Sequence, residues 1–351
     1  MLDCRTDVAV PAPGPGEVLI EVAACGMNNT DIWVREGAYG TDEDPNATAS
    51  WRRAGDNTLT FPRIQGADTA GHIVDVGEGV APARIGERVM VDFSIYNGDG
   101  RSLIDIDYIG HGRDGGFAEY VAVPSEQAHL CASPMSDAEL ATFCCAYLTG
   151  EHMLDRAALK AGETVLITGA SGGVGSALVQ LARARGAIPY AICGNTKVDL
   201  VKALGAEAVI GREEGDLAAA VTDAMSGKPL DVAADLVAGP LFGTLINLLR
   251  PEGRYTTAGA IAGPVVNLDL RTVYLKHLTL HGSSQGTKAA FDRLHGYIES
   301  GAIKPLLWQT YPLSDIRAAQ AAFKAKGYVG KLVLQPDAKW QPVTPWTERQ
   351  T

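Results

Sequence analysis

The feature that most constrains the fold is a glycine-rich segment, GASGGVG, at residues 169–175. An apolar run at 163–168 precedes it and predicts a buried strand, and the pattern over 174–185 predicts an amphipathic helix after it. A strand, a glycine turn and a helix in this order are typical of a dinucleotide-binding unit. A tight turn that binds no ligand is the alternative interpretation.

Individual positions of the turn match the needs of a bound pyrophosphate. Gly172 allows the backbone to approach the phosphates, and Gly175 allows the helix and the strand to pack closely. The helix N-terminus adds free N–H groups and the positive end of its dipole. Ala170 stands where the usual GxGxxG pattern has its first glycine, which is a departure from that pattern.

Strand and helix patterns alternate on both sides of this turn, from about residue 136 to residue 285. The further strands are predicted at 188–193, 208–210, 231–237, 253–258 and 278–282, and the further helices at 138–154, 197–204 and 216–225. Such alternation predicts an α/β fold with a parallel, doubly wound sheet. It favours the dinucleotide site over the turn without a ligand.

The rest of the chain has shorter, β-rich patterns. Strands are predicted at 17–23, 72–76, 88–93, 117–123 and 331–334, and helices at 288–300 and 316–325. The polar segment 41–60 reads as a loop insertion. The tail beyond Pro336 is expected to be loosely structured.

Cofactor choice depends on the end of the strand at 188–193, about 20 residues after the turn. The chain there carries Gly194, Asn195 and Lys197, and no carboxylate that would hold the ribose hydroxyls of NAD. Lys197, with Arg212 after the next strand, would face a 2′-phosphate, although Lys197 also fits a solvated helix surface. We therefore expect NADP(H).

Composition excludes several other classes of function. The net charge of −11 disfavours nucleic acid or an anionic membrane surface as a partner. No signal peptide and no run of about 18 apolar residues is visible. The six cysteines include no CxxC pair, which is consistent with reduced thiols in the cytoplasm.

An ordered set of short motifs covers almost the whole chain. They lie at 26–31, 66–71, 77–80, 86–89, 115–120, 145–149, 169–175 and 330–333. This set resembles the medium-chain dehydrogenase/reductase superfamily and, within it, the quinone oxidoreductase-like branch. The resemblance implies a GroES-like β-barrel catalytic domain at 1–135 and 286–351. It also implies an inserted Rossmann domain at 136–285.

The zinc alcohol dehydrogenases of this superfamily hold a catalytic metal with cysteine and histidine. By the same likeness, Asn28 replaces their cysteine, while Ala67 and Asp68 replace the histidine and glutamate of a Gly-His-Glu motif. Cys145 alone matches a ligand position, and residues 92–115 contain no cysteine for a structural zinc loop. This is a poor zinc donor set, so we expect a zinc-free protein. We interpret the neighbouring His72 as a strand residue rather than a substitute ligand.

Without a metal, an oxyanion in the transition state needs hydrogen-bond donors. The resemblance implies a substrate-site role for Asn28 and a proton-relay role for the Thr30 hydroxyl. Tyr147 either donates a proton or packs in the core, and Asp68 orients Asn28 or a backbone turn. The cofactor contacts implied by the glycine turn and the resemblance are Thr149, Ala170, Ser171, Gly172, Gly173, Val174, Gly194, Asn195, Lys197, Arg212, Ala258, Gly259, Ser283 and Lys331.

The leading functional hypothesis is NADPH-dependent reduction of an activated C=C bond or a quinone in a small-molecule substrate. One alternative is metal-free alcohol or carbonyl redox chemistry. Another, of a different class, is a nucleotide-binding sensor or structural homologue without turnover. The resemblance also implies a homodimer.

Overall fold

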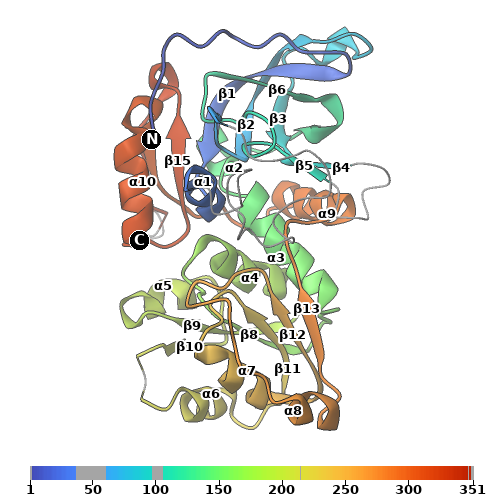
Figure 1. Ribbon diagram of the computed structural model, residues 1–351, viewed down its shortest axis with the longest axis vertical. Coiled ribbons are helices and arrows are strands. Elements are labelled where there is room, and N and C mark those ends of the chain that lie inside the picture. Colours follow the sequence, from blue (N-terminus) through green and yellow to red (C-terminus); the bar gives the residue numbers. More distant parts are fainter. Residues whose placement is uncertain (1, 37–60, 97–105, 214, 347, 349–351) are drawn as a thin grey trace. The chain divides into compact units, whose positions relative to one another are not determined.

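The computed structural model describes residues 2–36, 61–96, 106–213, 215–346 and 348. The described chain divides into two compact units (Figure 1). Unit 1 comprises 1–145, 287–291 and 305–351, and unit 2 comprises 146–286 and 292–304. The first division falls inside helix α3 (Cys144–Arg156), whereas the sequence placed a domain boundary at 135.

A seven-stranded sheet dominates unit 1. Its strands are β1 (Glu17–Gly26), β2 (Asp68–Val76), β3 (Arg88–Val91), β6 (Tyr120–Pro124), β7 (Ala128–Leu130), β14 (Leu307–Pro312) and β15 (Lys331–Gln335). The order is β14-β15-β1-β2-β3-β7, with β6 also paired to β1. Strand β15, from the end of the chain, is antiparallel to β1, so unit 1 is completed by the C-terminal segment.

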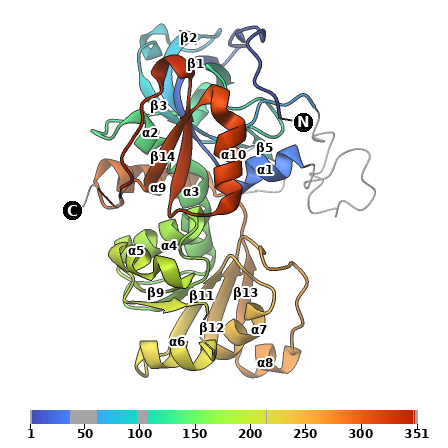
Figure 2. The same cartoon turned by 90° about the vertical axis from the view of Figure 1, so that its left-hand side faces the viewer.

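Smaller elements surround this sheet. They are the hairpin strands β4 (Ser94–Tyr96) and β5 (Ile106–Tyr108), and the helices α1 (Asn29–Arg35), α2 (Asp137–Leu140) and α10 (Ile316–Ala325). Helix α10 lies against β14 and β15, as Figure 2 shows. It buries Ile316, Ala319 and Phe323, which are spaced to share one helical face.

Unit 2 is built on six parallel strands in the order β10-β9-β8-β11-β12-β13. They are β8 (Thr164–Ile167), β9 (Ile188–Cys193), β10 (Ala208–Gly211), β11 (Leu230–Asp235), β12 (Leu249–Thr257) and β13 (Thr279–Gly282). The helices of this unit include α4 (Gly173–Ala184), α5 (Val198–Ala203), α6 (Leu217–Met225), α7 (Leu241–Leu248) and α8 (Leu270–Leu275). Helix α9 (Lys288–Glu299) begins in unit 1 and ends in unit 2. From β8 the chain adds β9 and β10 on one side of the sheet, and it then adds β11, β12 and β13 on the other side. This strand order confirms the doubly wound Rossmann architecture.

Several details differ from the sequence-based expectations. The helix predicted at 138–154 is two helices, α2 and α3, with the residues between them in turns. The strand predicted from 117 starts at Tyr120, because the N–H groups of Gly116 and Phe117 donate to the carbonyl oxygens of residues 66 and 65 instead. The tail is not loose throughout, since Trp346 is buried and its backbone N–H donates to Leu307.

Two further expectations concern segments rather than elements. The loop insertion expected at 41–60 lies outside the described residues. Within the described ranges, no helix is both long and apolar enough to cross a membrane.

Candidate functional site

Most of the expected cofactor residues gather at one edge of the parallel sheet of unit 2. Each of five strands is followed directly by some of them: β8 by 170–174, β9 by 194, 195 and 197, β10 by 212, β12 by 258 and 259, and β13 by 283. Parallel strands end at the same edge of their sheet, so these residues lie along one line. Ligands of open α/β sheets bind outside the carboxyl ends of the strands.

The glycines of the turn between β8 and α4 have different reasons for being glycine. A Cβ on Gly175 would lie 2.2 Å from the carbonyl oxygen of Gly169, so this position must stay bare for the turn to close. Gly169 itself has a φ of +57°. Gly172, by contrast, has an extended backbone, with φ −79° and ψ 172°. It has room for a Cβ, because the nearest atom, the carbonyl oxygen of Gly169, would lie 3.4 Å from it.

The chain itself therefore does not require a glycine at position 172. Gly172 is the N-cap residue of α4, and the backbone N–H groups that follow it begin the helix. This is the geometry of an anion site at a helix N-terminus. Glycine is also a favoured N-cap residue, and at this position it leaves the first N–H groups of α4 open to a ligand.

The ends of β9 and β10 carry a carboxylate that the sequence reasoning missed. Glu213 accepts a hydrogen bond from the backbone N–H of Asn195 at 2.9 Å and another from Arg212 Nε at 2.8 Å. The Arg212 side chain lowers the pKa of Glu213, as does the Asn195 N–H group. The search for a carboxylate at the end of β9 overlooked it, because Glu213 follows the neighbouring strand.

A second missed residue, Asp235, ends β11 in full burial. Its carboxylate accepts hydrogen bonds from Thr168, from Tyr255 and from the backbone N–H groups of Val237 and Ala238. These bonds join the ends of β8, β11 and β12. Asp235 therefore fixes the strand ends on which the expected cofactor residues stand. The signal in the sequence that could have indicated this role is an aspartate at the end of an apolar strand.

Two expected residues of unit 2 have partners that define their roles. Ser283 Oγ lies 3.1 Å from His152 Nδ1, so helix α3 holds the segment after β13. Tyr147 is buried; its hydroxyl donates to the Lys304 carbonyl at 3.0 Å and accepts from Gln180 Nε2 at 2.8 Å. Burial raises the pKa of Tyr147 well above its usual range. These observations favour packing over proton donation for Tyr147.

Unit 1 holds a separate buried cluster around Asp68, the first residue of β2. One carboxylate oxygen accepts the backbone N–H of Cys145, at the start of α3, at 2.6 Å. The other accepts Asn28 Nδ2 at 3.1 Å and Lys331 Nζ at 2.9 Å. Asp68 therefore orients Asn28, which was one of its two expected roles.

Lys331 was expected at the cofactor, but the structure gives it contacts within unit 1. Its ammonium group also donates to Asn28 Oδ1 at 2.5 Å, and only 3% of its surface is exposed. Burial opposes its charge, yet the nearby Asp68 outweighs this effect, and the pKa of Lys331 is raised. The lysine therefore remains an ammonium ion that fixes the Asn28 amide.

Two residues that follow Asn28 in the chain, Thr30 and Asp31, are also affected by burial. Burial raises the pKa of Asp31 from 3.8 to about 7, and its carboxylate accepts the Asn28 backbone N–H at 2.6 Å. The Thr30 hydroxyl oxygen is buried and has no hydrogen-bond partner among the described residues. Both amide hydrogens of Asn28 point inward, toward Asp68 and the Gly26 carbonyl. Thr30, rather than Asn28, therefore has hydrogen-bonding capacity left.

The residues at the zinc-ligand positions do not fit a zinc ion. Ala67 offers no donor, and Asn28 and Asp68 already share the ammonium group of Lys331. Cys145 is the one sulfur donor at these positions, and burial raises its pKa to about 12. Within the described ranges, no group of three His, Cys, Asp or Glu side chains is placed to hold a metal. His72 lies in strand β2.

Comparison with known proteins gives two family matches. Residues 14–133 match the alcohol dehydrogenase GroES-like domain, and residues 173–300 match the zinc-binding dehydrogenase family. The quinone oxidoreductase of Rattus norvegicus is 28% identical over 345 residues, covering 95% of this chain and 93% of its own.

Solved structures show the same relationship. A crystal structure of a "putative alcohol dehydrogenase" from Sinorhizobium meliloti 1021 is 68% identical, covers 94% of this chain and 91% of its own, and superposes with a TM-score of 0.90. A cobalt- and zinc-bound thermostable alcohol dehydrogenase from Pyrobaculum aerophilum is 32% identical, with 94% of each chain covered and a TM-score of 0.79.

Proposed function

Because the chain belongs to the medium-chain dehydrogenase/reductase superfamily, in its quinone oxidoreductase-like branch, we propose that it is an NADP(H)-dependent oxidoreductase of small molecules. The proposed reaction reduces an activated C=C bond or a quinone without zinc. A bound nicotinamide would supply the hydride. The observation that carries the proposal is the turn around Gly172, which leaves room at its Cα and caps the N-terminus of helix α4 at the carboxyl edge of the sheet.

The residues of unit 2 would hold the dinucleotide. The N–H groups after Gly172 would bind the pyrophosphate. Lys197 and Arg212, after β9 and β10, would pair with a 2′-phosphate. Asp235 and His152 would act through others, by fixing the strand ends and Ser283.

The cluster of unit 1 would act on the substrate. Among the described residues the Thr30 hydroxyl oxygen has no hydrogen-bond partner, so this hydroxyl would donate to a substrate oxygen as negative charge develops there. Lys331 and Asp68 hold Asn28 beside it in one orientation. In this proposal no metal polarises the substrate, in keeping with the poor donor set.

The experiment that tests the function is NADPH oxidation with a panel of quinones, enals, enones and simple aldehydes. Turnover of quinones or enones supports the proposal. Turnover of aldehydes alone supports the second candidate, metal-free alcohol or carbonyl redox, which the likeness to the Sinorhizobium meliloti protein favours. Tight NADPH binding without any turnover indicates the non-catalytic sensor.

Elemental analysis of the purified protein tests the absence of zinc separately. The proposal expects substoichiometric zinc and activity that survives a chelator. About one zinc per chain, removed together with activity, would contradict it.

We also propose a homodimer formed through unit 2. Strand β13 is an edge strand, and the segment that joins β12 to β13 carries exposed large apolar side chains: Ile261, Val265, Leu270, Tyr274 and Leu275. An exposed apolar patch beside an unpaired strand edge is typical of an interface. Analytical ultracentrifugation should give a dimer, and Leu275→Lys should shift it toward the monomer. A parent protein that is monomeric at micromolar concentration would contradict this assignment.

A further inference from the structure

The carboxylate of Glu213 lies beside Gly194, Asn195 and Arg212, which are residues of the proposed cofactor site. Its two oxygens accept from the Asn195 backbone N–H and from Arg212 Nε, so it is held at the junction of two loops. One oxygen lies 4.0 Å from the place where a Cβ on Gly194 would stand. The carboxylate therefore lies over the residues that directly follow β9.

The strand pairing explains why a residue after β10 reaches this place. Strands β9 and β10 run parallel, and Gly211 lies opposite Cys193 in their register. The residues after the two strands therefore leave the sheet side by side. Asn195 and Glu213 bond across this gap a second time, through the Asn195 amide oxygen and the Glu213 N–H group at 3.5 Å.

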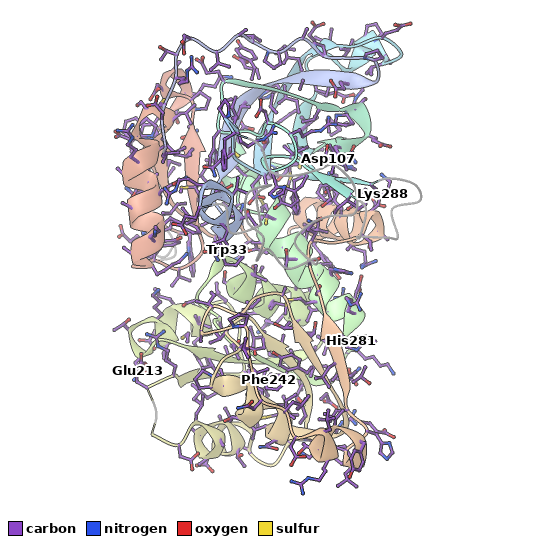
Figure 3. All side chains as sticks on the ribbon, in the orientation of Figure 1. Trp33, Asp107, Glu213, Phe242, His281 and Lys288 are labelled. Atoms are coloured by element: carbon purple, nitrogen blue, oxygen red, sulfur yellow. The ribbon has the colours of Figure 1, made fainter. Side chains whose placement is uncertain are left out.

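The charges at this junction have mixed signs. Lys197 and Arg212 are cations, while Glu213 is an anion that keeps nearly half of its side chain exposed. Figure 3 labels Glu213 at the surface of unit 2. A ribose with free 2′- and 3′-hydroxyls donates hydrogen bonds to a carboxylate, whereas a 2′-phosphate is repelled by one.

We propose that Glu213 determines cofactor choice by favouring the ribose hydroxyls of NAD(H) and limiting the preference for NADP(H) that Lys197 and Arg212 create. This inference rests on the proposed dinucleotide site at the edge of the sheet. Glu213 is then a specificity residue, and its hydrogen bond from the Asn195 N–H group holds the carboxylate in position. Arg212 then has two opposed tasks, to attract a phosphate and to neutralise Glu213.

The test is Glu213→Gln, with dissociation constants for NADPH and NADH measured by fluorescence titration. Glutamine can still accept from Asn195, so the loop connection is kept while the negative charge is lost. The Kd for NADPH should fall about tenfold, and the Kd for NADH should stay equal or rise.

Glu207→Gln is the matched control. Glu207 directly precedes β10, so it lies at the opposite edge of the sheet, and its exposed side chain is 3.9 Å from Lys228. The Glu207→Gln variant loses the same charge as Glu213→Gln. Its ratio of the Kd for NADPH to the Kd for NADH should stay within about twofold of the parent's ratio.

The possible outcomes separate the two proposals. If the parent binds both cofactors and Glu213→Gln leaves their Kd ratio unchanged, Glu213 does not determine cofactor choice, although the dinucleotide site stands. Equal weakening of both cofactors would show that Glu213 only braces the loops, which also overturns the inference. Failure of the parent to bind either cofactor would overturn both proposals.

Discussion

Lys331 Nζ lies 2.9 Å from Asp68 Oδ2, although the two residues are 263 positions apart in the chain. Both side chains are buried, with 3% and 0% of their surface exposed. An ion pair in such a place gains little over apolar packing, but removing one partner leaves the other charge buried and unpaired. The pair therefore makes the last strand of unit 1 and the start of β2 depend on each other.

We expect Lys331→Met to lower the free energy of unfolding by about 3–5 kcal/mol, because Asp68 loses its buried counter-charge. Urea denaturation measures this. The control is Lys339→Met, which breaks the more exposed pair with Glu21 and should cost at most about 1 kcal/mol. If the double variant Lys331→Met/Asp68→Asn were no more stable than Lys331→Met, the unpaired charge would not be the cause.

The buried carboxyl of Asp31 should make stability depend on pH. Burial raises its pKa from 3.8 to about 7, so the folded protein holds a proton that the unfolded chain releases above about pH 4. The contribution of this group to stability therefore falls as pH rises from about 4 to about 7. The largest loss that the shift allows is about 4 kcal/mol.

Asp31→Asn removes this titration. Relative to the variant, the parent should be less stable at about pH 8 than at about pH 5, as measured by urea denaturation at both values. A stability difference between parent and variant that stays constant over this range would show that Asp31 does not titrate there.

Gly172→Asp should separate stability from cofactor binding. Aspartate is a favourable N-cap, and the extended backbone accepts it, so the melting temperature should stay equal or rise. Its negative charge would stand where the pyrophosphate binds, so NADPH binding should be lost in titration. Gly172→Asn is the uncharged control. NADPH binding by Gly172→Asp at parental affinity would show that the phosphate site lies elsewhere.

Gly175→Ala should do the opposite at the same turn. Its Cβ would meet the backbone oxygen of Gly169 at 2.2 Å, and backbone cannot move aside as a side chain does. We expect a loss of about 1–3 kcal/mol in thermal or urea unfolding. Parental stability in this variant would contradict the close approach of α4 to β8.

Lys197→Ala should weaken NADPH binding about ten- to a hundredfold and leave NADH nearly unchanged, since only NADPH carries the 2′-phosphate. Parallel titrations with the two cofactors measure this. An equal loss for both would assign Lys197 to the fold or the adenine pocket. A parent protein that prefers NADH would contradict the proposed dependence on NADP(H).

The architecture was accessible from the sequence where the patterns were long and regular. Strand 188–193 and helix 316–325 agree with β9 and α10 in their bounds, because apolar period and turn residues define both ends. Helix α1 was missed, since its seven residues are too few to show a period. Helix α7 was also missed, because a short apolar segment does not distinguish a helix from a strand.

The candidate site was predicted in part. The glycine turn and the residues after each strand could be named because a strand followed by a turn marks the sheet edge. Glu213 and Asp235 could not be assigned roles, because their partners come from neighbouring strands, and a sequence does not state which strands are neighbours. Lys331 was placed at the cofactor by likeness, whereas its contacts with Asn28 and Asp68 depend on the pairing of β15 with β1.

That pairing also sets an order of events during synthesis. Strand β1 is complete once residue 26 has been made, but β15 begins only at residue 331. By then every residue of unit 2, which ends at 304, has already been made. Domains generally fold as units while the chain emerges, so unit 2 can fold while β1 still has an open edge. Of the two units, unit 1 thus begins before unit 2 in the chain but is completed after it, and Asp68 gains its partner Lys331 only at that later stage.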